Sequence, residues 1–476
     1  MNEIAIHRDF DMALRLFNTM SRQKEDFEPI EDGTVKMYTC GPTVYSFATI
    51  GNFRAYTFED LLRRYLKYKG YKVTQVMNLT DVDDKTIKGC QAESVPLDDY
   101  TETFKKAFFD DLDSLRIERA EVYPEATRHV PEMVAMIKKL IDRGIAYESG
   151  GSIYYKIEKF PDYGKLAHMD ISKLKAGARV ASDEYEKEQV SDFALWKAWD
   201  EADGPVFWET ELGKGRPGWH IECSAMSTKY LGNHFDIHCG GVDNMFPHHE
   251  NEIAQSEGAT GEKFVNYWLH NEHLIVEGRK MSKSLGNYYT LRQILDKGYP
   301  AVAVRYLLMS THYRQQLNFT FEGLEAAKSA IERLWDFMDA VGAVKGGDPN
   351  PEVDKIIGRA TDSFESALDD DLNISPALAA VFDFVRDINR LIHDNKLSAE
   401  DGAEVLDTMA RFDSVLGIVS KDEVDIDSEV EDLIVKRNEA RKNKDFAEAD
   451  RIRDDLLARG IVLEDTADGT KWKKKL

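Results

Sequence analysis

Side chains that suit a metal ion are concentrated in one part of this sequence. Seven of the twelve histidines fall between His220 and His273, together with two of the four cysteines. Within this stretch, His248 and Glu252 are four residues apart in "PHHENEIAQS", and the proline before them favours the first turn of a helix. Residues at this spacing share one helix face, so an imidazole and a carboxylate would lie together. The pair is a candidate for half of a metal-ligand set.

Two cysteines are candidates for the other half. Cys40 ends "VKMYTC", which we expect to be a buried strand, and Cys223 lies in "WHIECSAMS". If both reach one edge of a parallel sheet, a Cys–Cys–His–Glu set results, and Zn²⁺ prefers such thiolate and imidazole ligands. The sequence alone also allows a plainer role, because free cysteines are usually small buried hydrophobes and no C-x2-C pair is present. We expect that plainer role for Cys90 and Cys239. Three further histidines are expected either in a pocket or in hydrogen bonds within the core: His220, His238 and His249.

A second group of residues suits phosphate binding. The string "EGRKMSKSLGN" holds Lys280 and Lys283 between Gly278 and Gly286. Lysines on a loop flanked by glycines can close over a polyphosphate and neutralise its charge as it reacts. Two lysines three apart would indicate only an exposed turn, but here K-M-S-K-S is complete. The string therefore predicts a loop that contacts nucleotide phosphates.

The counterpart of this loop is the tetrapeptide "TIGN", Thr49 to Asn52, at the start of a predicted helix over 53–69. Gly51 would let a nucleotide approach the backbone closely. We expect Asn52 to be the N-cap residue of the helix. Free N–H groups and the helix dipole at the first turn attract an anion. Together the two strings predict a site for a nucleotide.

These residues need a scaffold that brings them to one edge. From 35 to 120 the pattern alternates strand, helix and strand: "VKMYTC", the apolar stripe of 53–69, and "KVTQVMNL". A β-α-β unit of this kind makes parallel pairing with a right-handed crossover. The sequence therefore predicts an α/β fold with a doubly wound, Rossmann-like parallel sheet, whose ligands bind beyond the carboxyl ends of its strands.

The other segments have different patterns. A helix ("VPEMVAMIKKLIDRG"), a hairpin ("IAYESGGSIYYKI") and a charged loop ("SDEYEKEQVSD") predict an insertion between two halves of the sheet. From 290 onward the pattern is nearly all helical, with a glycine- and proline-rich linker at 346–351 and a helix-bundle periodicity after it. We place the boundaries after residues 119, 215, 290, 345 and 422.

Composition limits the classes of protein that fit. With 476 residues, 42% of them hydrophobic and 31% charged, the chain is too long for one core and has an ordinary globular balance. No apolar run predicts a membrane span, and four cysteines are too few for a disulfide scaffold, so we expect a reduced, cytoplasmic location. The formal net charge of −24 speaks against indiscriminate nucleic-acid binding, although basic residues gather near the C-terminus.

With these residues in view, the chain resembles a known family. The class I aminoacyl-tRNA synthetases carry the signatures H-I-G-H and K-M-S-K-S, and this chain resembles the cysteinyl-tRNA synthetases among them. The resemblance extends over about residues 12 to 476. It is carried by "CGPTVY", "IGNFRAY", "NLTDVDDKTI", "GWHIECSAMS", "LGNHFDIHCGGVDNMFPHHENEIAQS", "KMSKSLGN" and "RNEARKNKDFAEADRIRDDLLARGIVLEDTADGTKW".

The resemblance implies a role for each candidate residue. The zinc ligands would be Cys40, Cys223, His248 and Glu252, the set considered above from chemistry. The catalytic residues would be Lys280, Lys283, Thr49 and Asn52. ATP would contact Thr49, Gly51, Asn52, Lys280, Met281, Ser282, Lys283 and Ser284. The amino-acid pocket would be lined by Cys40, Gly41, Trp219, His238 and Asp243. The tRNA would contact Arg437, Arg441, Lys444, Arg451, Arg453 and Trp472, although the acids interleaved among these bases also fit a solvated helix with ion pairs.

The resemblance also names the segments. Residues 1–119 and 216–290 would be the halves of the catalytic domain, the second with the zinc site and the K-M-S-K-S loop, and 120–215 the insertion between them. Residues 291–345 would be a stem-contact helical region and 346–422 a helical bundle. Residues 423–476 would form a small C-terminal anticodon-binding domain.

One residue departs from the family pattern. The family usually has histidine where this chain has Thr49, whereas asparagine at position 52 is a common variant. A hydroxyl can donate a hydrogen bond to a phosphate oxygen but brings no positive charge. Losing one charge-assisted hydrogen bond would cost on the order of 1–2 kcal/mol of transition-state stabilisation.

The implied activity is a cysteine–tRNA ligase. It would activate L-cysteine with ATP and transfer it to the 3′ end of tRNA(Cys), with one Zn²⁺ per chain selecting the thiolate and Mg²⁺ accompanying ATP. The expected partners are ATP, L-cysteine and tRNA(Cys), with no membrane, and the expected assembly is a monomer. Two alternatives remain open at this point: a ligase of the same fold that joins activated cysteine to an amino sugar, and a tRNA-binding paralogue with weakened catalysis.

Overall fold

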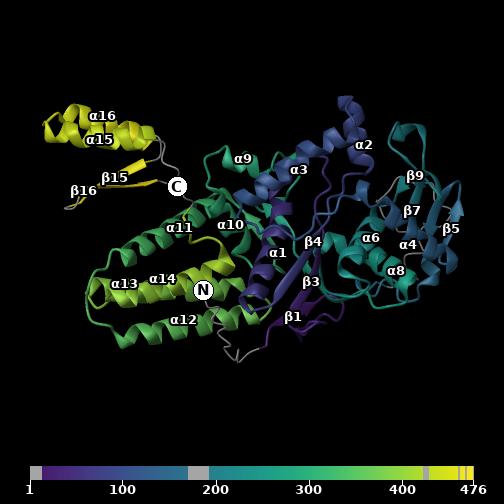
Figure 1. Ribbon diagram of the computed structural model, residues 1–476, viewed down its shortest axis with the longest axis horizontal. Coiled ribbons are helices and arrows are strands. Elements are labelled where there is room, and N and C mark those ends of the chain that lie inside the picture. Colours follow the sequence, from purple (N-terminus) through teal and green to yellow (C-terminus); the bar gives the residue numbers. More distant parts are fainter. Residues whose placement is uncertain (1–12, 170–191, 422–427, 459–460, 467–468, 475–476) are drawn as a thin grey trace, which may run out of the picture.

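A four-stranded parallel sheet forms the centre of the protein. The computed structural model describes residues 13–169, 192–421, 428–458, 461–466 and 469–474. The central strands are β3 (Thr34–Thr39), β4 (Lys72–Met77), β10 (Phe235–Gly241) and β11 (Val265–Asn271), in the order β11-β10-β3-β4 with every pairing parallel (Figure 1). The chain moves outward from β3 to β4 and, on the other side, from β10 to β11. The order therefore reverses between β3 and β10, and this reversal opens a crevice at their carboxyl ends. The predicted doubly wound sheet is confirmed.

Helices cover both faces of this sheet. α1 (Ile50–Tyr68) packs against Met37 of β3, whereas the next residue, Tyr38, packs with Cys223 of α6 (Trp219–Leu231). Successive side chains of a strand point to opposite faces. The two helices therefore lie on opposite sides of β3.

The helix α1 begins three residues earlier than the sequence pattern indicated. The Thr49 hydroxyl accepts a hydrogen bond from the Asn52 N–H at 3.3 Å, and the Asn52 side-chain oxygen accepts one from the Thr49 N–H at 2.9 Å. This reciprocal arrangement is a capping box, in which Thr49 is the N-cap residue. The prediction that Asn52 is the N-cap is wrong, because Asn52 occupies the third helical position and closes the box from inside the helix.

A separate antiparallel sheet is formed by the segment that separates the two halves of the central sheet in sequence. α2 (Asp84–Glu93), α3 (Leu97–Ser114) and α4 (Val130–Asp142) precede it. Its strands are β5 (Ala146–Ser149), β6 (Ser152–Tyr155), β7 (Phe193–Ala198), β8 (Trp208–Thr210) and β9 (Gly213–Pro217), in the order β5-β6-β7-β9-β8. The helix and the hairpin that we expected here are confirmed. The charged loop "SDEYEKEQVSD" lies outside the described residues except for Asp192.

Smaller elements complete the catalytic region. The hairpin of β1 (Arg15–Asn18) and β2 (Gln23–Asp26) precedes the central sheet, and α7 (Val242–Asn244) and α8 (Glu250–Thr260) follow β10. A three-stranded sheet in the order β13-β12-β14 follows β11. Its strands are β12 (Leu274–Val276), β13 (Arg279–Lys280) and β14 (Leu317–Phe319), and between β13 and β14 lie α9 (Leu291–Leu295) and α10 (Ala301–Met309).

Four long helices form the bundle. They are α11 (Phe321–Gly342), α12 (Pro351–Asp369), α13 (Ile374–His393) and α14 (Ala399–Leu416). The linker predicted at 346–351 separates α11 from α12, which begins at Pro351. The apolar faces of these helices share one buried cluster with α1 and β3, so the bundle is packed directly against the catalytic region.

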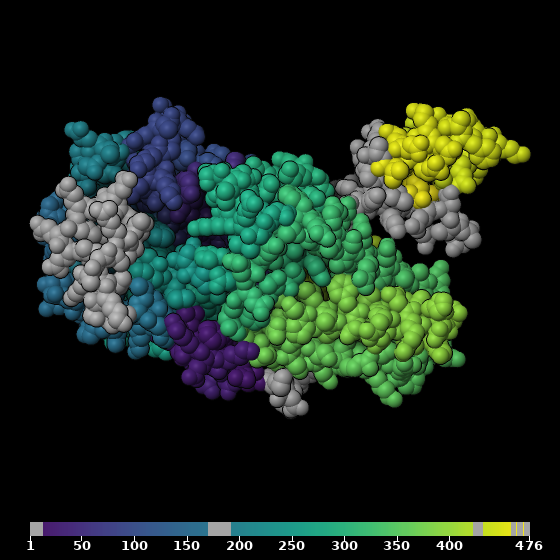
Figure 2. Space-filling view, turned by 180° about the vertical axis from the view of Figure 1, so that it is seen from behind, coloured from purple at the N-terminus to yellow at the C-terminus, as the bar shows by residue number. Residues whose placement is uncertain are grey.

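The C-terminal module is not all helical. It contains α15 (Ser428–Lys442), α16 (Phe446–Ala458) and an antiparallel hairpin of β15 (Ile461–Thr466) and β16 (Gly469–Lys474). The nearly all-helical pattern expected after residue 290 does not extend to this hairpin, whose strands pair from Ile461–Lys474 to Thr466–Gly469. The yellow elements of the module stand clear of the bundle in Figures 1 and 2.

Three consecutive aspartates dock the bundle onto the catalytic region at the end of α12. Asp369 accepts a hydrogen bond from the Tyr65 hydroxyl at 2.8 Å, and Asp370 pairs with Lys24 at 2.7 Å. Asp371 is fully buried and has several donors: the Phe17 N–H (2.8 Å), the Tyr313 hydroxyl (2.6 Å) and the Arg314 guanidinium (2.6 Å). A buried carboxylate with this many donors is expensive to disturb.

Replacing Asp371 by asparagine should therefore destabilise the protein. The Asp371→Asn variant would keep the shape of the side chain but leave the Arg314 charge and one donor unmatched, at a cost on the order of 3 kcal/mol. Asp370→Asn is the matched control, because the Lys24–Asp370 pair is substantially exposed and should be worth less than about 1 kcal/mol. Thermal unfolding of both variants checks this, and equal shifts in unfolding temperature would contradict it.

Candidate metal centre and nucleotide site

The structure brings together the four side chains that the sequence singled out as metal ligands. One sulfur, nitrogen or oxygen atom from each of Cys40, Cys223, His248 and Glu252 lies within 4.8 Å of the other three. Cys40 is the first residue after β3, Cys223 lies in α6, and Glu252 lies in the first turn of α8. His248 precedes α8 by two residues, and its Nε2 is 3.1 Å from Glu252 Oε1. The cluster therefore lies in the crevice where the strand order reverses.

Two further histidines surround this cluster and create a second possible ligand set. His238 Nε2 lies 2.9 Å from Glu252 Oε2, and His249 Nε2 lies 3.3 Å from Cys40 Sγ. Cys40, His238, His249 and Glu252 satisfy the same distance limit as the first set. The two sets share Cys40 and Glu252 and differ in whether the second thiol takes part.

The chemistry of the cluster fits a cation. Glu252 Oε1 is buried and accepts no hydrogen bond from any described residue, because His248 approaches it without hydrogen-bond geometry. A buried carboxylate oxygen without a partner is costly, and a metal ion would satisfy it. Two thiols, an imidazole and a carboxylate are also the donor types that Zn²⁺ binds.

Without a bound cation, the thiols of the cluster favour their protonated forms. The pKa of Cys40 is raised well above its usual range by a hydrogen bond to the Cys223 thiol and by burial. The same hydrogen bond lowers the pKa of Cys223, but burial together with the nearby Glu252 and Glu222 carboxylates outweighs it, and the pKa is raised. A cation would reverse this preference, since a coordinating thiol is deprotonated. Metal binding here would therefore release protons.

A hydrogen-bonded chain extends from Cys40 into the core. His249 Nδ1 lies 2.8 Å from His270 Nε2, and His270 Nδ1 lies 2.8 Å from the Thr19 hydroxyl. Burial lowers the pKa of His270 to about 3, so its imidazole is neutral at pH 7. No local signal in the sequence marks this chain, because its members come from β11, the segment before α8 and the loop after β1.

The burial of neutral His270 should make stability depend on pH. Its pKa is about 3 in the folded state and 6.5 in the unfolded state, so between these pH values only the unfolded chain binds a proton. The stability that the neutral imidazole contributes is therefore fully present above about pH 6.5 and is lost as the pH falls toward 3. His270→Gln cannot protonate and should lose less thermal stability between pH 7.5 and 5.5 than the parent. Parallel pH profiles of unfolding temperature would contradict the prediction.

The residues predicted to line the amino-acid pocket are partly buried and partly exposed. A Cβ at Gly41 would lie 1.8 Å from the Asn78 carbonyl oxygen, so only glycine fits beside Cys40. His238 is fully buried and holds Glu252, whereas Asp243 is exposed. Trp219 is also partly exposed, and its indole stacks on the His248 ring with centroids 4.2 Å apart. Trp219 therefore joins the rim of the pocket to the metal cluster.

The two segments predicted to bind phosphates, Thr49–Asn52 and the K-M-S-K-S loop, lie in contact. A Cβ at Gly51 would lie 3.1 Å from Cε of Met281, in the middle of K-M-S-K-S. The backbone also joins the two segments, since the Ile50 N–H donates to the Tyr289 carbonyl at 3.1 Å and Thr49 forms a bridge with Thr290. The first turn of α1 thus packs against the K-M-S-K-S loop and the residues that follow it, as the predicted nucleotide site requires.

The K-M-S-K-S loop is shaped by an asparagine that the sequence analysis did not single out. The Asn287 side chain accepts a hydrogen bond from the Ser282 N–H at 2.9 Å and donates to the Lys280 carbonyl at 3.1 Å. Lys280, Lys283 and Ser284 are exposed. The loop backbone is therefore held from within, while both lysines project from it and can meet an anion.

The basic residues near the C-terminus fall into two groups. Arg437, in α15, is buried and donates a hydrogen bond to the Thr470 hydroxyl of β16 at 3.1 Å. It therefore joins the helix to the hairpin in this arrangement. Arg451 pairs with Glu448 and Arg453 pairs with Asp450, each three residues apart on α16. Arg441 and Lys444 lie at the end of α15 and just after it, and Trp472 lies in β16. These ion pairs fit the alternative of a solvated helix as well as a tRNA-binding surface.

Family models and solved structures agree on the class of protein that this fold and site define. Residues 26–329 match the model of the class I (C) tRNA synthetase catalytic domain. A methionyl-tRNA synthetase of Mycobacterium tuberculosis is similar in structure with a TM-score of 0.59 at 14% identity, covering 81% of this chain and 90% of that one. A LeuRS of Agrobacterium radiobacter K84 gives a TM-score of 0.59 at 12% identity, covering 83% of this chain and 85% of that one. The chain has the fold of a class I tRNA synthetase.

Closer relatives identify the branch of that class. Residues 363–420 match a DALR domain, and residues 423–472 match the cysteinyl-tRNA ligase anticodon binding domain. A cysteine–tRNA ligase of Protochlamydia amoebophila is 52% identical over the full length of both chains. That of Solibacter usitatus is 51% identical over 98% of this chain and 100% of that protein. The chain belongs to the cysteine–tRNA ligase family.

Among the helices of the described ranges, none is long and apolar enough to cross a membrane.

Replacing Thr49 by histidine tests the departure from the family pattern. The Thr49 hydroxyl is occupied by Asn52, to which it donates at 2.8 Å, and it brings no charge to the first turn of α1. Thr49→His should retain or raise the rate of cysteine-dependent ATP–pyrophosphate exchange, while loss of the N-cap lowers stability by about 1 kcal/mol. A drop of more than tenfold in the exchange rate would show that the site is built around threonine.

Proposed function

We propose that this chain activates L-cysteine with ATP and transfers it from the adenylate to the 3′ end of tRNA(Cys). The observation that carries the proposal is the convergence of Cys40, Cys223, His248 and Glu252 within 4.8 Å. This cluster lies beyond the carboxyl end of β3, the strand whose connection to α1 contains the phosphate-binding turn at Thr49–Asn52. A soft-metal site beside a nucleotide site suits an enzyme that must recognise a thiol.

We assign the metal as one Zn²⁺ held by Cys40, Cys223, His248 and Glu252. We prefer this set to the one with His238 and His249, because two thiolates are available and zinc favours them. In this assignment His249 bonds to Cys40 and His238 bonds to Glu252, so each orients a ligand. When bound, zinc supplies a soft centre that prefers the thiolate of cysteine to the hydroxyl of serine, a distinction that shape alone makes by only about 1–3 kcal/mol.

In the first step, the cysteine carboxylate attacks the α-phosphorus of ATP and pyrophosphate leaves. The protein contributes mainly position and charge to such a reaction. The N–H groups of Ile50 and Asn52 already donate to the Tyr289 carbonyl and the Thr49 hydroxyl, so the Gly51 N–H and the positive end of the helix dipole would face the phosphates. Lys280 and Lys283 neutralise the charge that develops as the loop closes, with Met281, Ser282 and Ser284 lining the ATP site and Mg²⁺ accompanying ATP.

The amino acid is held from the other side of the crevice. Trp219 stacks on His248 and presents its exposed edge to the substrate. Gly41 leaves room above the Asn78 carbonyl, and Asp243, on the rim, suits the substrate ammonium. These contacts direct the carboxylate toward the nucleotide turn.

In the second step, a terminal ribose hydroxyl of tRNA attacks the adenylate carbonyl, and AMP leaves. We assign no protein base to this step. The C-terminal module would bind the anticodon, with Arg441, Lys444, Arg451 and Arg453 toward phosphates and Trp472 toward an unpaired base. We further propose a cytoplasmic monomer, since charging uses the pools of ATP and tRNA found there.

The match of residues 423–472 to an anticodon binding domain argues against the amino-sugar ligase, which would not need that module. The complete K-M-S-K-S loop argues against a paralogue without catalysis.

Replacing Cys223 by serine tests the role of the metal. The variant should lose both bound zinc and cysteine-dependent ATP–pyrophosphate exchange, because a hydroxyl is a far weaker zinc ligand than a thiolate. Cys239→Ser is the matched control, since Cys239, in β10, is equally buried but belongs to neither ligand set. It should keep its zinc. Metal content by atomic emission and exchange activity are measured on the same samples.

Two outcomes would count against this assignment. Full exchange activity in a zinc-free Cys223→Ser protein would remove the ion from cysteine selection. Equal loss of zinc in the Cys239→Ser control would show that the effect comes from disturbed packing and not from coordination.

A further inference from the structure

Three arginines of the catalytic region cap the end of the last bundle helix. The carbonyl groups in the final turn of a helix have no partners within the helix, and its negative end attracts cations. Here the partners are guanidinium groups that come from α1, from the segment after α3 and from α10. The hydrogen bonds are Arg64 to the Ser414 carbonyl (3.2 Å), Arg116 to the Gly417 carbonyl (3.4 Å) and Arg305 to the Leu416 carbonyl (2.7 Å).

Two of these guanidinium groups, those of Arg64 and Arg305, are held in turn by one carboxylate of α1. Asp60 Oδ2 lies 2.6 Å from Arg305 and 2.8 Å from Arg64, and both Asp60 and Arg305 are fully buried. Arg64 also donates to the Arg116 carbonyl at 2.6 Å. The three caps therefore form one network that belongs to the same helix as the nucleotide turn.

The chain after α14 is held from the other side as well. Asp413 accepts hydrogen bonds from the N–H groups of three successive residues: Ile418 (2.6 Å), Val419 (2.6 Å) and Ser420 (2.9 Å). Gly417 turns the chain with a φ of +65°, and a Cβ there would lie 3.1 Å from two nitrogens of Arg305. The turn at 417–420 is thus bonded on both sides, and its glycine lies directly against a capping arginine.

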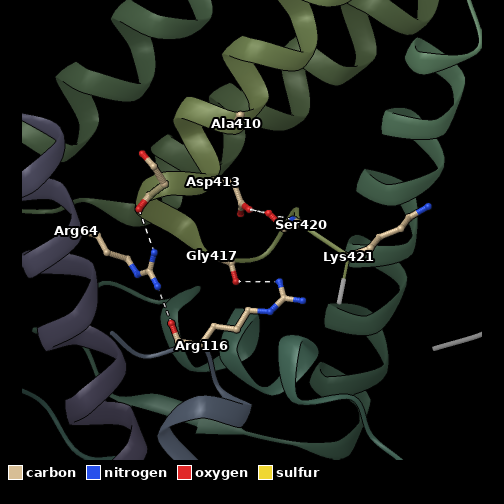
Figure 3. A pocket seen from close by; sticks show the side chains of 8 residues that line it. Arg64, Arg116, Ala410, Asp413, Gly417, Ser420 and Lys421 are labelled. Carbon is tan, nitrogen blue, oxygen red and sulfur yellow. Dashed lines mark hydrogen bonds between the residues drawn. The ribbon is translucent and has the colours of Figure 1, made fainter. Parts of the chain in front are cut away.

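Packing and hydrogen bonding both hold the path of this turn, since Ile418 and Val419 are buried in the core cluster that the bundle shares with α1. A cavity of about 390 Å³ lies against it, lined by Gly417, Ser420 and Lys421 on one side and by Arg64 and Arg116 on the other (Figure 3). Lys421 then bonds to Asp339 of α11 at 2.7 Å. On the side of the turn that faces this cavity, the arginine and aspartate bonds hold the chain in place.

We propose that Arg64, Arg116 and Arg305 are positioning residues for the transfer of the aminoacyl group to tRNA. They fix the direction in which the chain leaves the bundle, and the C-terminal module begins two residues after Lys421. A tRNA held by that module must still place its 3′ end beside the adenylate. The caps therefore set the position of the C-terminal module relative to the adenylate site, an inference that rests on the proposed function.

The variant Gly417→Ala tests this with little change elsewhere. Its Cβ would lie 3.1 Å from two nitrogens of Arg305, so the guanidinium would have to shift by a few tenths of an ångström against the cap. Gly33→Ala is the matched control, because Gly33 has a φ of +70° and no described atom within 4 Å of an added Cβ. Both variants carry the same backbone strain, and only one disturbs the caps.

Gly417→Ala should reduce kcat/KM for tRNA charging at least tenfold, while cysteine-dependent ATP–pyrophosphate exchange and the KM for cysteine stay within twofold of the parent. Gly33→Ala should leave both unchanged. Arg116→Ala should also lower kcat/KM for tRNA, and Arg116→Lys, which keeps one donor for the Gly417 carbonyl, should recover part of it. Unchanged charging by Gly417→Ala, or an equal loss of charging and exchange, overturns the proposal.

Small-angle X-ray scattering of the full chain separates this inference from the proposed function. If the parent shows no cysteine-dependent exchange, the proposed function fails, but the placement of the module can still be measured. A changed distance distribution for Gly417→Ala, with that of Gly33→Ala matching the parent, supports positioning by the caps. Identical distributions for all three proteins overturn it.

Discussion

The pairing of β3 with β10 is the contact on which the candidate sites depend. Met37, Tyr38 and Thr39 lie opposite Ile237, His238 and Cys239, and the Cys40 N–H continues the ladder to the Cys239 carbonyl at 3.3 Å. These strands come from halves of the sheet that a whole antiparallel domain separates in sequence. A slip of one residue would turn each side chain of β3 to the other face of the sheet. Cys40 would then point away from Cys223, and the turn toward α1 would move with it.

The same pairing also creates an energetic problem that a cation would solve. Thiols, imidazoles and a carboxylate are buried together, and the pKa values of both thiols are raised while that of His248 falls to about 3. Such groups cost free energy when they are desolvated without sufficient partners. Binding of a cation would offset that cost and couple the metal to folding of the crevice. The same bound cation would then both select the substrate and stabilise the edge of the sheet.

Features that depend on local periodicity could be predicted from the sequence. The strand at Thr34–Thr39, the helical spacing of His248 and Glu252, and the linker before α12 all follow from patterns of a few residues. The choice of N-cap could not be predicted, because threonine and asparagine are both good caps and only the reciprocal bonds of Thr49 and Asn52 decide between them. The His249–His270–Thr19 chain and the arginine caps of α14 join residues far apart in sequence, and no periodicity marks them. The C-terminal hairpin was missed because its strands lie in a mixed-charge segment.

One helix connects the candidate nucleotide site with the end of the bundle (Figure 1). α1 has 19 residues, so its axis is about 28 Å long at about 1.5 Å per residue. Its first turn lies against Met281 of the K-M-S-K-S loop, and its later turns carry Asp60 and Arg64, which hold the end of α14. A helix buried along most of its length does not bend easily, since both its ladder and its packing oppose it. The distance between the turn at Thr49–Asn52 and the end of α14 is therefore set by a single rigid element. The candidate nucleotide site and the end of the bundle are thus positioned together, because both are attached to α1.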